Sequence, residues 1–164
     1  MCHFLRGILR CAFAGVLFLS FQHAASAEKV MSAEPDNIFL LEEGRPVRLA
    51  GLIIPEESAN LISILLAGKE IKLRVDGILG DKDDHLHPHP VYIYVDTSEL
   101  SFPFADAANT HQQKVVVNEL LLGMGAAYVD QKLEFEMKER FLEIEAEAKL
   151  LGKGIWSYEE IPQS

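Results

Sequence analysis

The sequence predicts an α+β domain, and three observations lead to this fold class. Short segments of alternating apolar residues come first, short helical segments are interspersed among them, and the longest helical pattern comes last. A small β-barrel covered by helices is the natural closure of such a chain. Periodicity alone does not choose between this barrel and other α+β arrangements.

The first 27 residues are expected to be a signal peptide that lies outside the fold. Arg6 and Arg10 form a basic region, and an apolar run over residues 11–21 is too short to span a bilayer. Ala25 and Ala27 are the small residues that signal peptidase reads. We therefore expect cleavage after Ala27 and a periplasmic or secreted protein without a transmembrane segment. An uncleaved N-terminal anchor is the alternative.

Cleavage would change the composition of the chain. Removing 27 of the 164 residues leaves 137, the length of one domain, and both cysteines are lost with the signal. Removing Arg6 and Arg10 from the 15 basic residues leaves 13 against 25 acidic ones, a net charge of −12. This charge repels phosphates and disfavours nucleic acid as a partner. Residues 28–35 are expected to be a flexible lead-in, and residues 36–164 the domain.

The first elements of that domain are a β-hairpin and a helix. Apolar residues alternate on both sides of a turn at residues 42–44, which is typical of two paired strands. Pro55 ends this region. Ser58 is expected to be the N-cap of a helix that runs to Gly68, because the leucines and isoleucines between them have helical spacing.

Two longer strands and a short helix are expected next. Residues 69–79 and residues 91–95 each alternate between apolar and polar or aromatic side chains. Residues 115–124 are expected to form a short helix that Gly125 closes, and residues 127–129 a short strand.

The last helix has the clearest pattern. Its apolar residues recur every three or four positions and form one stripe, whereas Glu139, Glu143 and Glu147 lie off the stripe on a solvated face. Gly152 and Gly154 should end the helix, and Trp156 should fold back onto the core. The residues of the stripe are Met137, Phe141, Ile144, Ala148 and Leu151.

Several passages, taken in order over residues 36–157, resemble the staphylococcal-nuclease (thermonuclease-like) family. They are VRLAGL with PE (residues 47–52 and 55–56), VYIY (91–94), VNELL (117–121), GAAYV (125–129), EAEAK (145–149) and GIWS (154–157). The resemblance implies a five-stranded OB-type β-barrel with about three helices, the last of them long and amphipathic.

The resemblance also implies a set of site residues. In family members that cleave nucleic acid, carboxylates hold a calcium ion, a glutamate is the general base, and two arginines contact the phosphate. Arg48 matches the first arginine, Glu56 the general base, and Asp36 the first calcium carboxylate. The residues themselves leave other interpretations open: Arg48 and Glu56 are equally typical of structural ion pairs, and Asp36 of a turn.

Two family positions are not kept in this chain. The second calcium carboxylate falls on Ile53, which cannot ligate a hard cation. The second arginine falls at or near Pro88. Single electrostatic contributors to a transition state are worth roughly 3–4 kcal/mol, so losing these two should impair catalysis severely.

A run of histidines precedes the third long strand. On an extended segment His85, His87 and His89 would point to the same side. Three imidazoles beside a carboxylate suit zinc or copper. A solvated polar loop is the alternative interpretation.

The sequence thus supports two functional hypotheses. The first is an exported, catalytically impaired nuclease-like domain that binds a protein or metal partner. The second is a metal-dependent phosphodiesterase that hydrolyses DNA or RNA with Arg48 and Glu56. No cofactor is certain: calcium follows from the resemblance, and zinc or copper from the histidine run.

Overall fold

The computed structural model describes residues 28–34, 37–80, 88–100 and 114–158. The expected signal peptide, residues 1–27, lies outside these residues. The strands are β1 (Glu28–Glu34), β2 (Ile38–Leu41), β3 (Pro46–Leu49), β4 (Leu52–Ile53), β5 (Glu70–Val75), β6 (His89–Asp96), β7 (Lys114–Val116) and β8 (Tyr128–Val129). The helices are α1 (Glu56–Leu66), α3 (Val117–Gly123) and α4 (Lys138–Leu150), with the 3₁₀ turns η2 (Thr97–Glu99) and η3 (Gly154–Tyr158).

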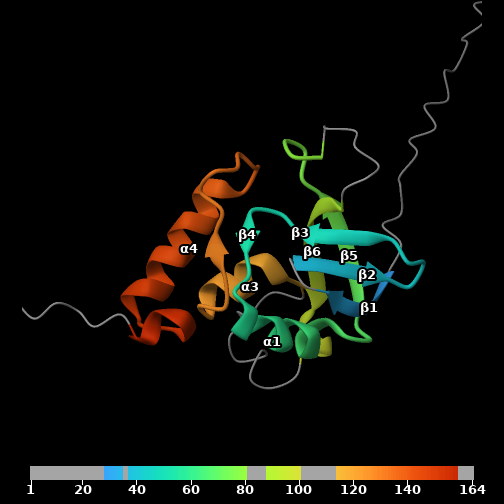
Figure 1. Cartoon of the computed structure of the whole chain (residues 1–164), viewed down its shortest axis with the longest axis horizontal. Helices are drawn as coiled ribbons and strands as arrows, with labels where there is room; N and C mark the ends of the chain where they lie inside the picture. Colours follow the sequence, from blue (N-terminus) through green and yellow to red (C-terminus); the bar gives the residue numbers. More distant parts are fainter. Residues whose placement is uncertain (1–27, 35–36, 81–87, 101–113, 159–164) are drawn as a thin grey trace, which may run out of the picture.

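Five strands close into a barrel. They are hydrogen-bonded in the order β3-β2-β1-β5-β6, and a parallel pairing of β3 with β6 completes the ring. The other pairings within the ring are antiparallel. Figure 1 shows the barrel on the right, α4 on the left, α3 and β4 between them, and α1 beneath. The predicted α+β class, with an OB-type five-stranded barrel and a C-terminal helix, is confirmed.

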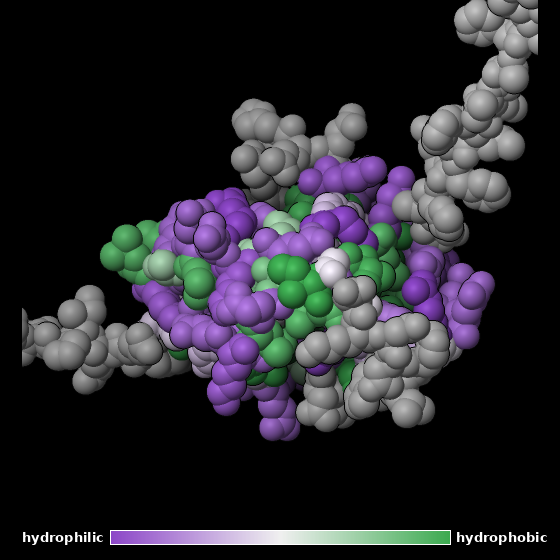
Figure 2. Space-filling model, turned by 90° about the horizontal axis from the view of Figure 1, so that it is seen from above, coloured by the Kyte–Doolittle hydropathy of each residue, from purple (hydrophilic) through white to green (hydrophobic). Residues whose placement is uncertain are grey.

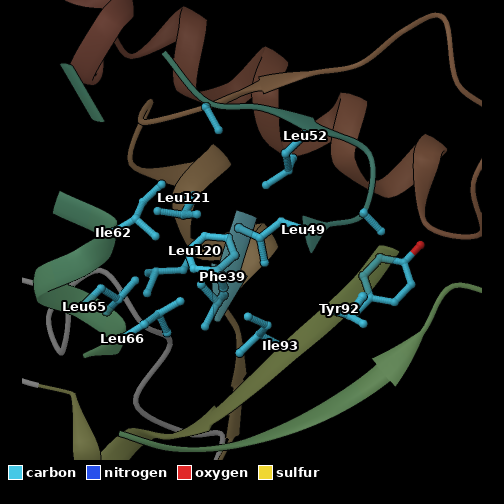
Figure 3. Close-up of a cluster of buried hydrophobic side chains, with 14 of the residues drawn as sticks. Phe39, Leu49, Leu52, Ile62, Leu65, Leu66, Tyr92, Ile93, Leu120 and Leu121 are labelled. Carbon is cyan, nitrogen blue, oxygen red and sulfur yellow. The ribbon is translucent and has the colours of Figure 1, made fainter. Parts of the chain in front are cut away.

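The core fills the barrel and the space between the barrel and its helices. Side chains from β2, β3 and β6 meet those of α1 and α3 in one cluster (Figure 3). On β3, Val47 and Leu49 are buried and Arg48 between them is only half-buried, because successive side chains of a strand point to opposite faces. Outside the barrel, the ring of Phe141 packs 6.0 Å from that of Tyr92. This contact seats α4 against β6.

The expected flexible lead-in is wrong. Residues 28–34 form β1, which pairs with β2 on one side and with β5 on the other. Val30 is 1% exposed and belongs to the core. Since β1 joins β2 to β5, the barrel ring would be open without it.

The first helix begins earlier than expected. Its N-cap is Pro55, and Ser58 lies buried within the first turn. Glu56 and Glu57 occupy this turn, where the positive end of the helix dipole favours carboxylates. Since proline fits the start of a helix, residue 55 ends the strand region and opens the helix at once.

Two other boundaries also differ from the prediction. The strand expected over residues 69–79 ends at Val75, because Asp76 turns the chain: its Oδ1 accepts hydrogen bonds from the backbone N–H groups of Ile78 and Leu79. The helix expected over residues 115–124 begins only at Val117. The residues before it form β7, which pairs with the end of β6.

Asp76 is a fully buried carboxylate at the centre of a hydrogen-bond network. Its Oδ2 accepts hydrogen bonds from the Tyr92 hydroxyl and from the backbone N–H of Glu136. Burial by itself raises the pKa of Asp76, but these hydrogen bonds, led by that of Tyr92, outweigh it and lower the pKa below its ordinary value. Burial, followed by the bond to Asp76, raises the pKa of Tyr92. The network ties the turn after β5 to the segment before α4.

The predicted apolar stripe of α4 is only partly correct. Phe141 and Ala148 are fully buried, but Leu151 is 56% exposed because the helix ends at Leu150. Glu145 is buried instead, at 4% exposure. Its Oε1 accepts a hydrogen bond from the backbone N–H of Val129, and its Oε2 pairs with Lys149, each at 2.9 Å.

The chain leaves α4 as predicted and returns to the core. Gly152 and Gly154 both have positive φ, and Trp156 is 8% exposed. The Lys149 Nζ lies 4.3 Å from the centre of the Trp156 ring. Gly125 lies against this exit, and a Cβ there would meet the carbonyl oxygen of Lys153 at 2.1 Å. Only glycine permits this approach of two backbones.

Apolar side chains also reach the surface. Seen from above, they emerge in the middle of a largely hydrophilic face (Figure 2). None of the described helices has both the length and the apolar character needed to cross a bilayer. Among the described residues, the exposed large hydrophobic ones are Met31, Ile53, Ile64, Val75, Ile78, Leu150 and Leu151.

Candidate functional site

Arg48 and Ile53, two positions singled out by the family resemblance, line the same pocket of about 250 Å³. The pocket lies where β3 and β4 meet the segment that follows β8. We refer to it as the Arg48 pocket. Its lining residues are Asn37, Arg48, Leu49, Gly51, Leu52, Ile53, Ile54, Asp130 and Leu133.

Arg48 brings to this pocket a guanidinium that has no partner among the described residues. It lies opposite Ile38 on β2 and Pro90 on β6, so its backbone is held by strands on both sides. No ion pair or hydrogen bond of its guanidinium is found within the described part of the chain. A half-buried guanidinium offers five N–H donors, and carboxylates and phosphates are its usual partners.

Ile53 is half-exposed where the family resemblance requires a carboxylate. On β4 its neighbour Leu52 is 7% exposed and faces the core, whereas Ile53 is 49% exposed. β4 is held by β8, with Ile53 opposite Tyr128. This position of the pocket therefore offers an apolar surface and no oxygen ligand.

Glu56 is not among the residues that line the Arg48 pocket. It is exposed at the first position of α1, directly after Pro55. The structure therefore brings Arg48 together with Ile53 and does not bring Glu56 into the same pocket. The expected general base has the surroundings of an ordinary carboxylate at a helix N-terminus.

The metal-ligand predictions fall largely outside the described residues. Asp36, His85 and His87 are not among the described residues, so neither the calcium carboxylate nor the histidine run is tested. His89 is described: it is half-buried at the start of β6, opposite Val47. Among the described residues, no group of three or more His, Cys, Asp or Glu side chains is placed to hold a metal ion.

Two polar residues of the lining, Asn37 and Asp130, were not singled out from the sequence. Asn37 has a φ of 65°, and its Nδ2 donates hydrogen bonds to the carbonyl oxygens of Leu49 and Leu52. It thereby fixes one wall of the pocket. Asparagine is among the few non-glycine residues that adopt this conformation readily, but nothing in the sequence marks Asn37 as lying beside Arg48.

Asp130 brings a second charge to the Arg48 pocket. Its backbone N–H donates to the carbonyl oxygen of Gly51, which holds the segment after β8 against the barrel. One oxygen of its carboxylate accepts the backbone N–H of Lys132 at 3.0 Å. Asp130 and Arg48 are not ion-paired with each other, since no described contact between them is within 4.0 Å.

Neither the comparison with protein-family models nor the comparison with curated proteins finds a match to this chain.

Proposed function

We propose that this protein is an exported, nuclease-like OB barrel that binds a partner protein through the Arg48 pocket and does not cleave nucleic acid. The observation that carries the proposal is that Arg48 and Ile53 line one pocket and that Glu56 does not line it. A guanidinium without a partner among the described residues, beside an exposed apolar side chain, suits recognition of a peptide. At the position that the family resemblance assigns to a second calcium carboxylate, Ile53 offers no oxygen ligand to a metal ion that would stabilise a phosphoryl transition state.

The net charge of the exported domain also supports a protein partner over nucleic acid. Its expected value of −12 opposes the approach of a polyanion. A metal partner remains part of the proposal through the histidine run, of which only His89 is described. Export itself belongs to the proposal, and recovery of a chain that begins at Glu28 would support it.

A phosphodiesterase is the second candidate function. The observation that favours it is again Arg48, which has no partner among the described residues, since such a guanidinium also suits a phosphate. Glu56 would then have to reach the substrate from the start of α1.

A nuclease assay separates the two functions. Purified protein should not cleave single-stranded DNA or RNA in millimolar calcium above the level of a Glu56→Gln variant. The assay should be run at low and at physiological ionic strength, because like-charge repulsion is least screened at low salt. Calcium-dependent cleavage that disappears in Glu56→Gln would establish the phosphodiesterase. Cleavage only with zinc, lost in His87→Ala, would move the site to the histidine run.

Photo-crosslinking tests the binding function directly. A photoreactive side chain at position 53 should give a discrete adduct with a partner, and the adduct should be lost when Arg48→Gln is added. The matched control is the same side chain at position 64, since Ile64 is 69% exposed but lies on α1 and does not line the pocket. An adduct that survives Arg48→Gln would contradict binding through the Arg48 pocket.

A further inference from the structure

The charged groups of the Arg48 pocket limit what its ligand can be. Among the described residues of its lining, Arg48 and Asp130 are the charged ones, and they are not ion-paired with each other. The Arg48 guanidinium is a cationic donor that would be satisfied by an anionic hydrogen-bond acceptor. The second carboxylate oxygen of Asp130 has no hydrogen-bond partner within the described ranges and calls for an N–H donor.

These two demands distinguish between anions. A phosphate would satisfy Arg48, but its further negative charge would meet the Asp130 carboxylate and be repelled. A ligand with one carboxylate and a nearby N–H group satisfies both side chains. The last residue of a polypeptide has this pair of groups, in its free α-carboxylate and its backbone N–H.

Beside the polar Asn37, the pocket has an apolar wall. Ile53, Ile54 and Leu133 contribute to it. Its volume of about 250 Å³ lies just below the range of roughly 300–1,000 Å³ that drug-sized ligands occupy. It has room for one or two residues with an apolar side chain, but not for a folded surface element.

We propose that the Arg48 pocket captures the free C-terminus of a partner protein that ends in an apolar residue. Arg48 binds the α-carboxylate, Asp130 accepts the N–H of the last residue, and the apolar wall receives its side chain. This inference rests on the proposed binding function of the same pocket and names the part of the partner that is recognised.

Calorimetry with short peptides tests the inference. The probe is a pentapeptide of glycine and serine that ends in leucine with a free carboxylate. We expect it to bind the wild-type protein, and its C-terminal amide to bind roughly 10- to 100-fold more weakly, the range expected for one lost charged hydrogen bond. Replacing the leucine with glycine should weaken binding roughly tenfold, because the apolar burial is lost.

Variants of the protein assign the contacts. Arg48→Gln should weaken binding of the free-acid peptide as much as amidation does. The Arg48→Gln protein should then bind the free-acid and the amidated peptide with equal affinity. The matched control is Arg140→Gln, since Arg140 is an exposed arginine on α4 that pairs with Glu119 and Glu143. This variant should bind like the wild type. Unchanged chemical shifts away from the pocket would show that both variants are folded.

Other outcomes overturn the inference. Equal binding of acid and amide, or no binding at millimolar peptide, would exclude C-terminal capture. Binding of an amidated peptide with an internal glutamate as tight as that of the free acid would indicate an acidic side-chain site. Tighter binding of a nucleoside phosphate would indicate a phosphate site. If peptides fail while the nuclease assay stays negative, only this inference falls; calcium-dependent cleavage would remove the proposed function itself.

Discussion

Two regions of the molecule each hold a charged side chain that is at least partly buried, but only one of these side chains has hydrogen-bond partners. On the α4 side, Glu145 is 4% exposed, and both of its oxygens have partners in Val129 and Lys149. In the Arg48 pocket, Arg48 is half-buried and its guanidinium has no partner in the part of the chain that the structure describes. A buried charge with all its hydrogen bonds made contributes to the fold, whereas one left open costs free energy unless a ligand satisfies it. The difference separates the structural polar groups from the candidate site.

The largest expected effect lies on the α4 side. Phe141→Ala removes a fully buried ring that packs against Tyr92 and Phe135. It should lower the free energy of unfolding by about 3–5 kcal/mol, the range for such a change in a core. Urea unfolding followed by circular dichroism measures it. A loss below about 1 kcal/mol would mean that α4 does not contribute to the core in this way.

Glu145→Ala tests whether the buried carboxylate is structural. It leaves the backbone N–H of Val129 unpaired and should cost about 1–3 kcal/mol. Glu147→Ala is the matched control, because Glu147 is an exposed residue of the same helix and its loss should stay within about 0.5 kcal/mol. Equal losses of stability in the two variants would mean that the buried Glu145 contributes no more to the fold than an exposed glutamate does.

Asp76 predicts a pH dependence. Its folded-state pKa is lowered, so its contribution to stability is fully present above the unfolded-state pKa of about 3.9 and is lost as pH falls through the lower folded-state pKa. Asp76→Asn should therefore be less stable than wild type at neutral pH. Its stability should also fall less steeply below about pH 5. Urea midpoints at a series of pH values measure this, and parallel curves for the two proteins would contradict it.

The smallest expected effect lies in the Arg48 pocket. Arg48→Gln removes no described hydrogen bond or ion pair and should change the free energy of unfolding by less than about 0.5 kcal/mol. Arg74→Gln is the contrasting control, because Arg74 pairs with Glu136 and lies 4.6 Å from the centre of the Tyr92 ring. Its loss should cost about 1 kcal/mol. An Arg48 variant as costly as the Arg74 variant would make Arg48 a structural residue.

The elements with strong local periodicity were predictable from the sequence. The hairpin of β2 and β3, the strand β6 and the helix α4 all follow the apolar pattern. β1 was not predictable, because only Val30 marks it as part of the core, and its strand conformation depends on pairing with β2 and the distant β5. The burial of Glu145 was not predictable for a similar reason: its partner, the N–H of Val129, lies 16 residues away.

The candidate site was predictable only in part. The family resemblance marked Arg48 and Ile53, and both line one pocket. It also marked Glu56, which does not line it. Asp130 had no signal in the sequence, since it reaches the pocket only because the segment after β8 is hydrogen-bonded to Gly51. Asp130 lies in the pocket because a segment distant in sequence folds back against Gly51, and no local sequence pattern predicts such a contact.

The parallel pairing of β3 with β6 has a consequence for how this protein behaves at high concentration. Because it completes the ring, each of the five barrel strands is hydrogen-bonded to a neighbour on both sides. A strand with a free edge is a template on which other chains can pair and aggregate. Closing the ring therefore leaves fewer such templates than an open five-stranded sheet would, and β4, β7 and β8 are the described strands that lie outside it.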